Sequence, residues 1–206
     1  MKLYYSSGSC SMSCHITLEE SGLPYEAVQV DFDKPTDAAL VEKMNALGTL
    51  PVLHTDDGKQ LDQNLAIHHY VALKAPAKNL MPAPGTPTYF EAINLLTFVA
   101  TDLHKSVGAL FGLAAYENDK PVQATVRKNL LGRANETLKY LDTKLQGKDY
   151  VMGSQFTAID AYAFTVASWT KYVDISLAPY PTLEKYLGRV AARPAVAKVL
   201  KEEGLV

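Results

Sequence analysis

A proline-rich segment divides the chain into two parts whose hydrophobic patterns differ. Between Ala75 and Pro87 the sequence APAKNLMPAPGTP contains four prolines and one glycine, a composition typical of an extended connector. Before it, short apolar runs alternate with turn signals, whereas after it the apolar residues recur with a helical period. We therefore predict two domains, residues 1–78 and residues 87–206.

The first domain has the pattern of a small sheet flanked by helices. Residues 2–5 and 25–31 have the composition of strands, and a helix between them is expected to stop at Gly22. A second helix over 37–46, two short strands joined by a turn, and a helix from Gln63 complete the order βαβαββα. This order predicts an α/β domain with helices available for both faces of a mixed sheet.

The second domain is expected to be entirely helical. Its first two helices each carry an apolar stripe, formed by Ile93, Thr97, Ala100, His104, Val107 and Phe111 on the first and by Val122, Val126, Leu130, Ala134, Leu138, Leu141 and Leu145 on the second. A later helix is predicted to begin at Thr157, whose spacing from Asp160 matches a capping box. Pro181 and Pro194 suit the first turns of two more helices.

Composition limits the kinds of partner that the chain can have. Twenty Lys and Arg residues balance 22 Asp and Glu residues, for a net charge of −2, which argues against nucleic acid or an anionic membrane. We expect a cytoplasmic protein, because there is no apolar leader and no apolar stretch long enough to span a bilayer. The two cysteines do not form the framework of a secreted scaffold, so reduced thiols are favoured.

The opening segment places both cysteines near one predicted helix start. Cys10 lies where the strand gives way to the helix, and unpaired amides and the helix dipole there predict a nucleophilic thiol of lowered pKa. The alternative is that Cys10 is a small buried side chain. Cys14 is expected to pack inside the helix, because Cβ vectors on neighbouring turns rarely permit a disulfide. Ser11 could donate to a thiolate or cap the helix, and capping is favoured. No cluster has zinc spacing, so no metal site is expected.

These segments, in this order, resemble the cytosolic glutathione S-transferases, and the first 22 residues resemble most the bacterial beta class. The resemblance rests on Cys10–Ser11, residues 15–22, 50–53 and 63–67, Leu103–His104–Lys105, and residues 156–162. It covers the whole chain. It implies a thioredoxin-like domain that binds glutathione, a helical domain that supplies an apolar substrate site, glutathione as co-substrate without any other cofactor, and a homodimer.

The resemblance also implies roles for single residues. Cys10 would contact the glutathione sulfur and could form a mixed disulfide with it. His104 would face that sulfur from the helical domain and could hold a proton near neutral pH, stabilise the thiolate or bind the glycyl end. The proline that matches Pro51 is cis in thioredoxin-like domains, which would expose the amide and carbonyl of Leu50 to the cysteinyl backbone of glutathione.

Four further residues are implied to line the glutathione site. Gln63 and Asn64 open a helix and would bind the γ-glutamyl carboxylate, although the family more often has Ser or Gly at the second position. Thr97 stands where the beta class often has Asn. Lys34 lies near the position at which the family has a lysine that binds the glycyl carboxylate. The remaining histidines are expected to be structural or solvated: His15, His54, His68 and His69.

We therefore predict a detoxification enzyme that conjugates reduced glutathione to small apolar electrophiles. Its work would be to stabilise the thiolate and to position it, with Cys10 and His104 as catalytic residues. Glutathione-dependent thiol–disulfide exchange through Cys10 is a variant on the same fold. A non-catalytic binder of apolar ligands, or a scaffold, is the alternative.

Overall fold

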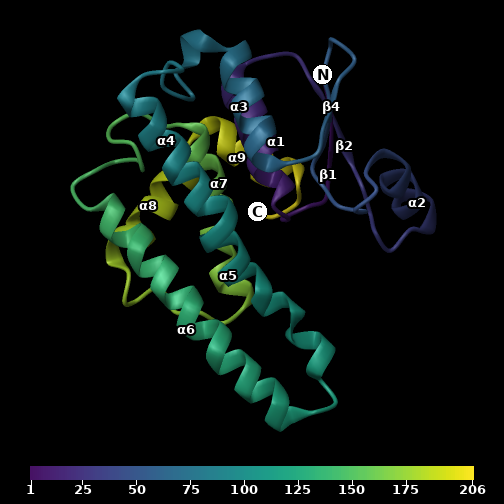
Figure 1. The fold of residues 1–206 in the computed structure, drawn as a ribbon, viewed down its shortest axis with the longest axis vertical. Helices are drawn as coiled ribbons and strands as arrows, with labels where there is room; N and C mark the ends of the chain where they lie inside the picture. The colour runs from purple at the N-terminus through teal and green to yellow at the C-terminus, as the bar shows by residue number, and fades with distance from the viewer. The chain divides into compact units, whose positions relative to one another are not determined.

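The computed structural model describes all 206 residues, which form two compact units (Figure 1). The first unit comprises residues 1–89 together with residues 191–206, and the second comprises residues 90–190. The predicted division into residues 1–78 and 87–206 stays a prediction. In the structure, residues 191–206 belong to the same compact unit as the first part of the chain.

The first unit contains a four-stranded mixed sheet in the order β2-β1-β3-β4. The strands are β1 (Lys2–Tyr5), β2 (Glu26–Gln29), β3 (Val52–His54) and β4 (Gln60–Leu61). In the register, Leu3 on β1 lies opposite Ala27 in the parallel pair and opposite Leu53 in the antiparallel pair. A parallel pair needs a crossover, and the helix α1 (Ser11–Ser21) supplies it. The predicted order βαβαββα is confirmed.

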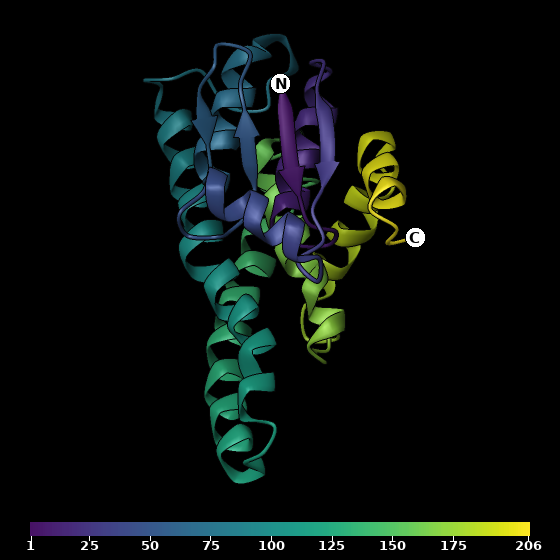
Figure 2. The same ribbon diagram turned by 90° about the vertical axis from the view of Figure 1, so that its right-hand side faces the viewer.

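Helices cover both faces of this sheet. In Figure 1, α1 and α3 (Asn64–Lys74) lie on one side of the strands and α2 (Pro35–Met44) lies on the other, and Figure 2 views the sheet from the side of α2. The last helix, α9 (Pro194–Glu202), packs against α1. The predicted helix 37–46 begins at Pro35 instead, because proline suits a first helical turn.

Helix α1 is buried along most of its length, from Ser11 to Leu18. Its apolar side chains belong to the core of the unit, which is formed by Leu3, Tyr5, Cys14, Leu18, Leu53, Ile67 and Val71. The helix ends as predicted at Gly22, whose φ of 67° is in the left-handed region. Because α1 lies between α3 and α9, its hydroxyl and imidazole groups must find hydrogen-bond partners inside the protein.

The second unit is entirely helical, as predicted. Its helices are α4 (Pro87–Phe98), α5 (His104–Gly108), α6 (Lys120–Leu145), α7 (Ala158–Ser168) and α8 (Pro181–Ala191), joined by tighter or wider turns over 99–103, 109–116 and 169–172. Every residue from Ala158 to Ala167 is buried, and α7 packs against α5 and the 99–103 turn. Helix α7 is therefore the core of this unit.

The predicted apolar stripe on the first helix of this unit is wrong except at Val107, which is buried. The buried side consists of Ala92, Leu96, Val99, Leu103 and Val107, whereas Thr97 and Phe111 are exposed. The turn Val99–Leu103 is π-helical, and such a turn holds more residues than an α-helical one. A spacing of seven residues across it therefore does not bring His104 onto the face of Thr97.

Two other predictions for this unit have a clear outcome. On α6 the predicted stripe is buried from Ala134 to Leu145, but Val122 is exposed. The capping box of α7 is confirmed, since the Asp160 carboxylate accepts the Thr157 amide at 2.8 Å. No helix anywhere in the chain combines the length and the apolar character that a membrane span requires.

Candidate functional site

Cys10 lies at the junction between the loop after β1 and the first turn of α1. Its backbone is helical, with φ −61° and ψ −20°, and its side chain is half-buried. The thiol donates to the carbonyl oxygen of Leu50 at 3.5 Å. The Leu50–Pro51 peptide bond is cis, as predicted. The fold thus brings Cys10 and the cis-proline loop, forty residues apart in the chain, to one place.

The first amides of α1 are not left unpaired, contrary to the expectation. The amide of Ser11 donates to the Ser9 hydroxyl at 3.3 Å, and the amide of Met12 donates to the Ser9 carbonyl at 3.1 Å. The amide of Ser13 donates to the Cys10 carbonyl at 3.2 Å. Two effects were expected to favour a thiolate at Cys10, unpaired amides and the helix dipole. Of these two, only the dipole of α1 remains.

Ser11 does not cap the helix, and this prediction is wrong. Its hydroxyl donates to the Ser6 carbonyl at 3.2 Å and accepts the Ser6 amide at 3.0 Å. It also lies 2.7 Å from the Ser9 hydroxyl. Ser11 is fully buried, so its hydroxyl closes the loop before Cys10 instead of serving the helix or a thiolate.

Gln63 and Asn64 point in different directions at the start of α3. Gln63 is exposed, whereas Asn64 is buried. The Asn64 amide nitrogen donates to the Cys10 carbonyl at 3.1 Å, and its oxygen lies 3.6 Å from the Cys14 thiol. Both ends of the Asn64 side chain thus have partners inside the protein, and its predicted part in an anion site stays a prediction. The backbone amides at the start of α3 remain suited to a carboxylate.

Behind Asn64 a buried histidine joins α3 to α1. The His68 ring lies 3.1 Å from the Ser13 hydroxyl through Nε2 and 2.8 Å from the Thr17 hydroxyl through Nδ1. Ser13 in turn donates to the Cys10 carbonyl at 2.7 Å. Burial lowers the pKa of His68 to about 3, so the ring is uncharged at neutral pH. Sequence reasoning missed this network, although polar residues four apart on each helix were a signal for it.

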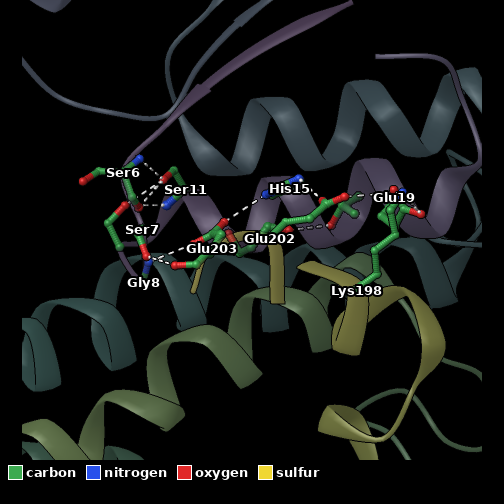
Figure 3. A network of polar contacts seen from close by, with 12 residues as sticks. Ser6, Ser7, Gly8, Ser11, His15, Glu19, Lys198, Glu202 and Glu203 are labelled. Atoms are coloured by element: carbon green, nitrogen blue, oxygen red, sulfur yellow. Dashed lines mark hydrogen bonds and ion pairs between the residues drawn. The ribbon is translucent and has the colours of Figure 1, made fainter. Parts of the chain in front are cut away.

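A second polar network ties the end of α9 to the loop before Cys10 (Figure 3). The Glu203 carboxylate accepts the Gly8 amide at 2.8 Å and lies 3.0 Å from Nδ1 of His15. The Glu203 carbonyl accepts the Ser7 hydroxyl. The loop is therefore held on its outer side by the last residues of the chain, a contact that no local pattern predicted.

Cys14 is fully buried, and burial raises the pKa of its thiol. Neither Cys14 nor Cys10 forms a disulfide. No group of three or more His, Cys, Asp or Glu side chains is arranged to hold a metal ion.

The two predicted site residues of the second unit differ in their surroundings. Nδ1 of His104 lies 2.7 Å from the Tyr162 hydroxyl. The His104 and Trp169 rings pack edge to face, with their centroids 5.1 Å apart. Burial is the main reason that the pKa of His104 falls to about 4, which favours an uncharged ring at neutral pH. The predicted role of His104 at the glutathione site stays a prediction. Thr97 is exposed on α4.

Lys34 lies in the first unit, at the residue before α2, with an exposed side chain that pairs with Asp31 at 3.4 Å. Of the predicted residues, the structure therefore gathers Cys10, Leu50–Pro51 and Asn64 by direct contact. It shows no such contact for Lys34.

A cysteine at the start of the first helix, next to a cis-proline loop, defines a thioredoxin-like domain, and a helical unit follows it along the chain. A family model described as the glutathione S-transferase N-terminal domain matches residues 8–73, and the C-terminal domain model matches residues 107–194. The chain is 35% identical to the glutathione S-transferase GstA of Escherichia coli O157:H7 over the whole of both chains. The protein belongs to the glutathione S-transferase family.

Two solved structures extend this assignment. A sphingomonad glutathione S-transferase, solved with glutathione, is 34% identical over the whole of both chains with a TM-score of 0.87. A beta-class enzyme from Sphingomonas chungbukensis is also 34% identical over the whole of both chains, with a TM-score of 0.89. The similarity to the bacterial beta class is thus confirmed, and the protein is a transferase of this family.

Proposed function

We propose that the protein conjugates reduced glutathione to small apolar electrophiles, with Cys10 beside the glutathione sulfur. The observation that carries the proposal is the 3.5 Å contact between the Cys10 thiol and the Leu50 carbonyl, next to the cis bond to Pro51. A peptide that pairs with the backbone of Leu50 would place its own cysteine side chain next to Cys10. The sphingomonad relative solved with glutathione supports this ligand.

The rest of the tripeptide would be held by its two carboxylates. The backbone amides at the start of α3, with the exposed Gln63, suit the γ-glutamyl carboxylate. Lys34 is proposed for the glycyl carboxylate because its ammonium is exposed and its ion pair is with Asp31, a partly exposed aspartate. From the helical unit, Thr97 and His104 are proposed as further contacts. His104 would act as a neutral donor through Nε2 when Tyr162 donates to Nδ1.

The chemistry that follows is a nucleophilic displacement. Glutathione loses its thiol proton to solvent, its sulfur attacks an electrophilic carbon, and the leaving group departs with the bonding electron pair. The protein lowers the barrier by holding the thiolate and the electrophile in place. In the exchange variant, the Cys10 thiolate attacks one sulfur of oxidised glutathione, which releases one glutathione thiolate and leaves a mixed disulfide.

Turnover of a chlorinated nitroaromatic by wild type, Cys10→Ala and Cys14→Ala tests the proposal. We expect turnover in wild type, a loss of about tenfold or more in Cys10→Ala, and little change in Cys14→Ala because that thiol is buried. Wild-type activity that survives in Cys10→Ala would contradict the role of Cys10. If wild type neither turns over nor binds glutathione in calorimetry, the non-catalytic alternative replaces the proposal.

We also propose that the enzyme is a cytoplasmic homodimer. This extends the family assignment to assembly and location. A monomeric mass by light scattering at micromolar concentration would contradict the dimer.

A further inference from the structure

The carbonyl of Cys10 is held by more donors than a helix start requires. It accepts the amide of Ser13 at 3.2 Å, the hydroxyl of Ser13 at 2.7 Å and the side-chain amide of Asn64 at 3.1 Å. Asn64 was expected to contact a ligand because it lies at the start of α3. Its side chain instead donates to the carbonyl of Cys10, the proposed reactive cysteine.

A comparison of donor hydrogens with the acceptors in reach shows which side chain donates to the Cys10 carbonyl in every protonation state of His68. Ser13 has one hydroxyl hydrogen but two acceptors within reach, the Cys10 carbonyl and Nε2 of His68. If His68 carries its proton on Nδ1, toward Thr17, then Nε2 takes the Ser13 hydrogen and the Cys10 carbonyl loses it. The Asn64 amide has no competing acceptor that is closer than the Cys10 carbonyl, because its contact with the Ser13 hydroxyl is longer, at 3.4 Å.

The orientation of the Asn64 amide follows from the same chemistry. A carbonyl oxygen can only accept, so the group that faces the Cys10 carbonyl must be the NH2 of Asn64. The oxygen then faces the Cys14 thiol, which can donate to it. Both ends of the buried amide are satisfied inside the protein, and satisfaction of this kind fixes a side chain.

We infer that Asn64 is a positioning residue for Cys10, backed by Ser13 and His68, and that its side chain does not bind glutathione. This inference rests on the proposed function for the role of Cys10 in the reaction. With its carbonyl held from α3, the Cys10 peptide group stays at the start of α1, and its thiol stays against the Leu50 carbonyl. Without Asn64 the peptide group can turn and the thiol can leave Leu50.

The test measures Cys10 without glutathione. The rate of alkylation of Cys10 by iodoacetamide is compared, by peptide mapping, in wild type, Asn64→Ala, Asn64→Leu and the matched control Gln63→Ala. Asn64→Leu keeps the branching and the number of side-chain heavy atoms, leaves no cavity and removes the polar contacts, so it separates a lost hydrogen bond from a cavity. Cys14 is an internal reporter, because it is fully buried and becomes reactive only when the packing around α1 opens.

We expect both Asn64 variants to change the Cys10 rate by about threefold or more, the effect of one net hydrogen bond. The change should be a rise, because the half-buried thiol is freed from Leu50. Cys14 should stay protected in all variants, and Gln63→Ala should stay within about twofold of wild type. An unchanged Cys10 rate in both Asn64 variants overturns the inference, as does labelling of Cys14 in parallel with Cys10.

Steady-state kinetics separate this role from that of a ligand. A residue that bound glutathione directly would raise KM on substitution and leave the ligand-free alkylation rate unchanged, which is the result expected of Gln63→Ala. Because the alkylation requires neither glutathione nor turnover, it tests Asn64 even if the proposed transferase activity fails. Failure of the inference and failure of the proposed function therefore give different results.

Discussion

The carboxylate of Glu203 accepts a hydrogen bond from the amide of Gly8 at 2.8 Å, although 195 residues separate them in the chain. Gly8 has a φ of 67° and lies two residues before Cys10. The end of the chain thus fixes the conformation of the loop that carries the proposed reactive thiol (Figure 3).

This contact predicts different effects for two neighbouring glutamates. In Glu203→Gln the half-buried Gly8 amide and the buried His15 ring lose a charged partner, and the free energy of unfolding should fall by about 1–3 kcal/mol. Glu202 is exposed, so Glu202→Gln should change the free energy of unfolding by about 0.5 kcal/mol or less. Denaturant unfolding of both variants measures the difference. Equal losses would contradict the role given to Glu203.

The titration of His68 predicts how acid acts on stability. Its pKa falls from 6.5 to about 3 on folding, because burial disfavours the charged ring. The unfolded chain therefore binds a proton first, and stability is lost as the pH falls below about 6.5. By pH 5 this loss is about 2 kcal/mol for one such group. His68→Gln should lose less stability than wild type between pH 7 and pH 5 in urea unfolding, and parallel curves would contradict the prediction.

Asp160 should act with the opposite sign. Burial raises its pKa from 3.8 to about 6, although its carboxylate accepts the amides of Val151 and Thr157 and the hydroxyl of Tyr186. Between about pH 4 and pH 6 the folded chain keeps the Asp160 proton, whereas the unfolded chain has lost it. The stability that this proton contributes is therefore fully present below about pH 4 and is lost as the pH rises through 6. The stability advantage of wild type over Asp160→Asn should therefore shrink, by roughly 3 kcal/mol at most, from pH 4 to pH 7. An advantage that grows with pH would refute this sign.

The low pKa of His104 makes a prediction about catalysis. A ring with a pKa of about 4 does not change its charge between pH 5 and pH 9. We expect His104→Gln to lower kcat/KM for conjugation while the apparent pKa of the pH–rate profile stays where it is. Tyr162→Phe, which removes the partner of Nδ1, serves as the companion variant. If the limb near neutral pH disappears in His104→Gln, the histidine titrates there after all.

Local sequence determined the elements that depend on nearby residues. The stop at Gly22, the helix start at Thr157 and Asp160, and the order of strands and helices follow from propensity and capping within a few residues. The cis bond before Pro51 and the cysteine beside it were expected from the resemblance, since their order along the chain carries it.

Tertiary structure decided what local patterns could not. Asn64 was expected to face an anion because it opens a helix, yet its side-chain amide donates to the carbonyl of Cys10. Thr97 and His104 were placed on one face by an α-helical count, which the π-helical turn between them breaks. Glu203 reaches Gly8 only because α9 packs on α1. In each case the partner is distant in sequence or the helical period changes, so the contact depends on how the chain packs and not on which residues are neighbours.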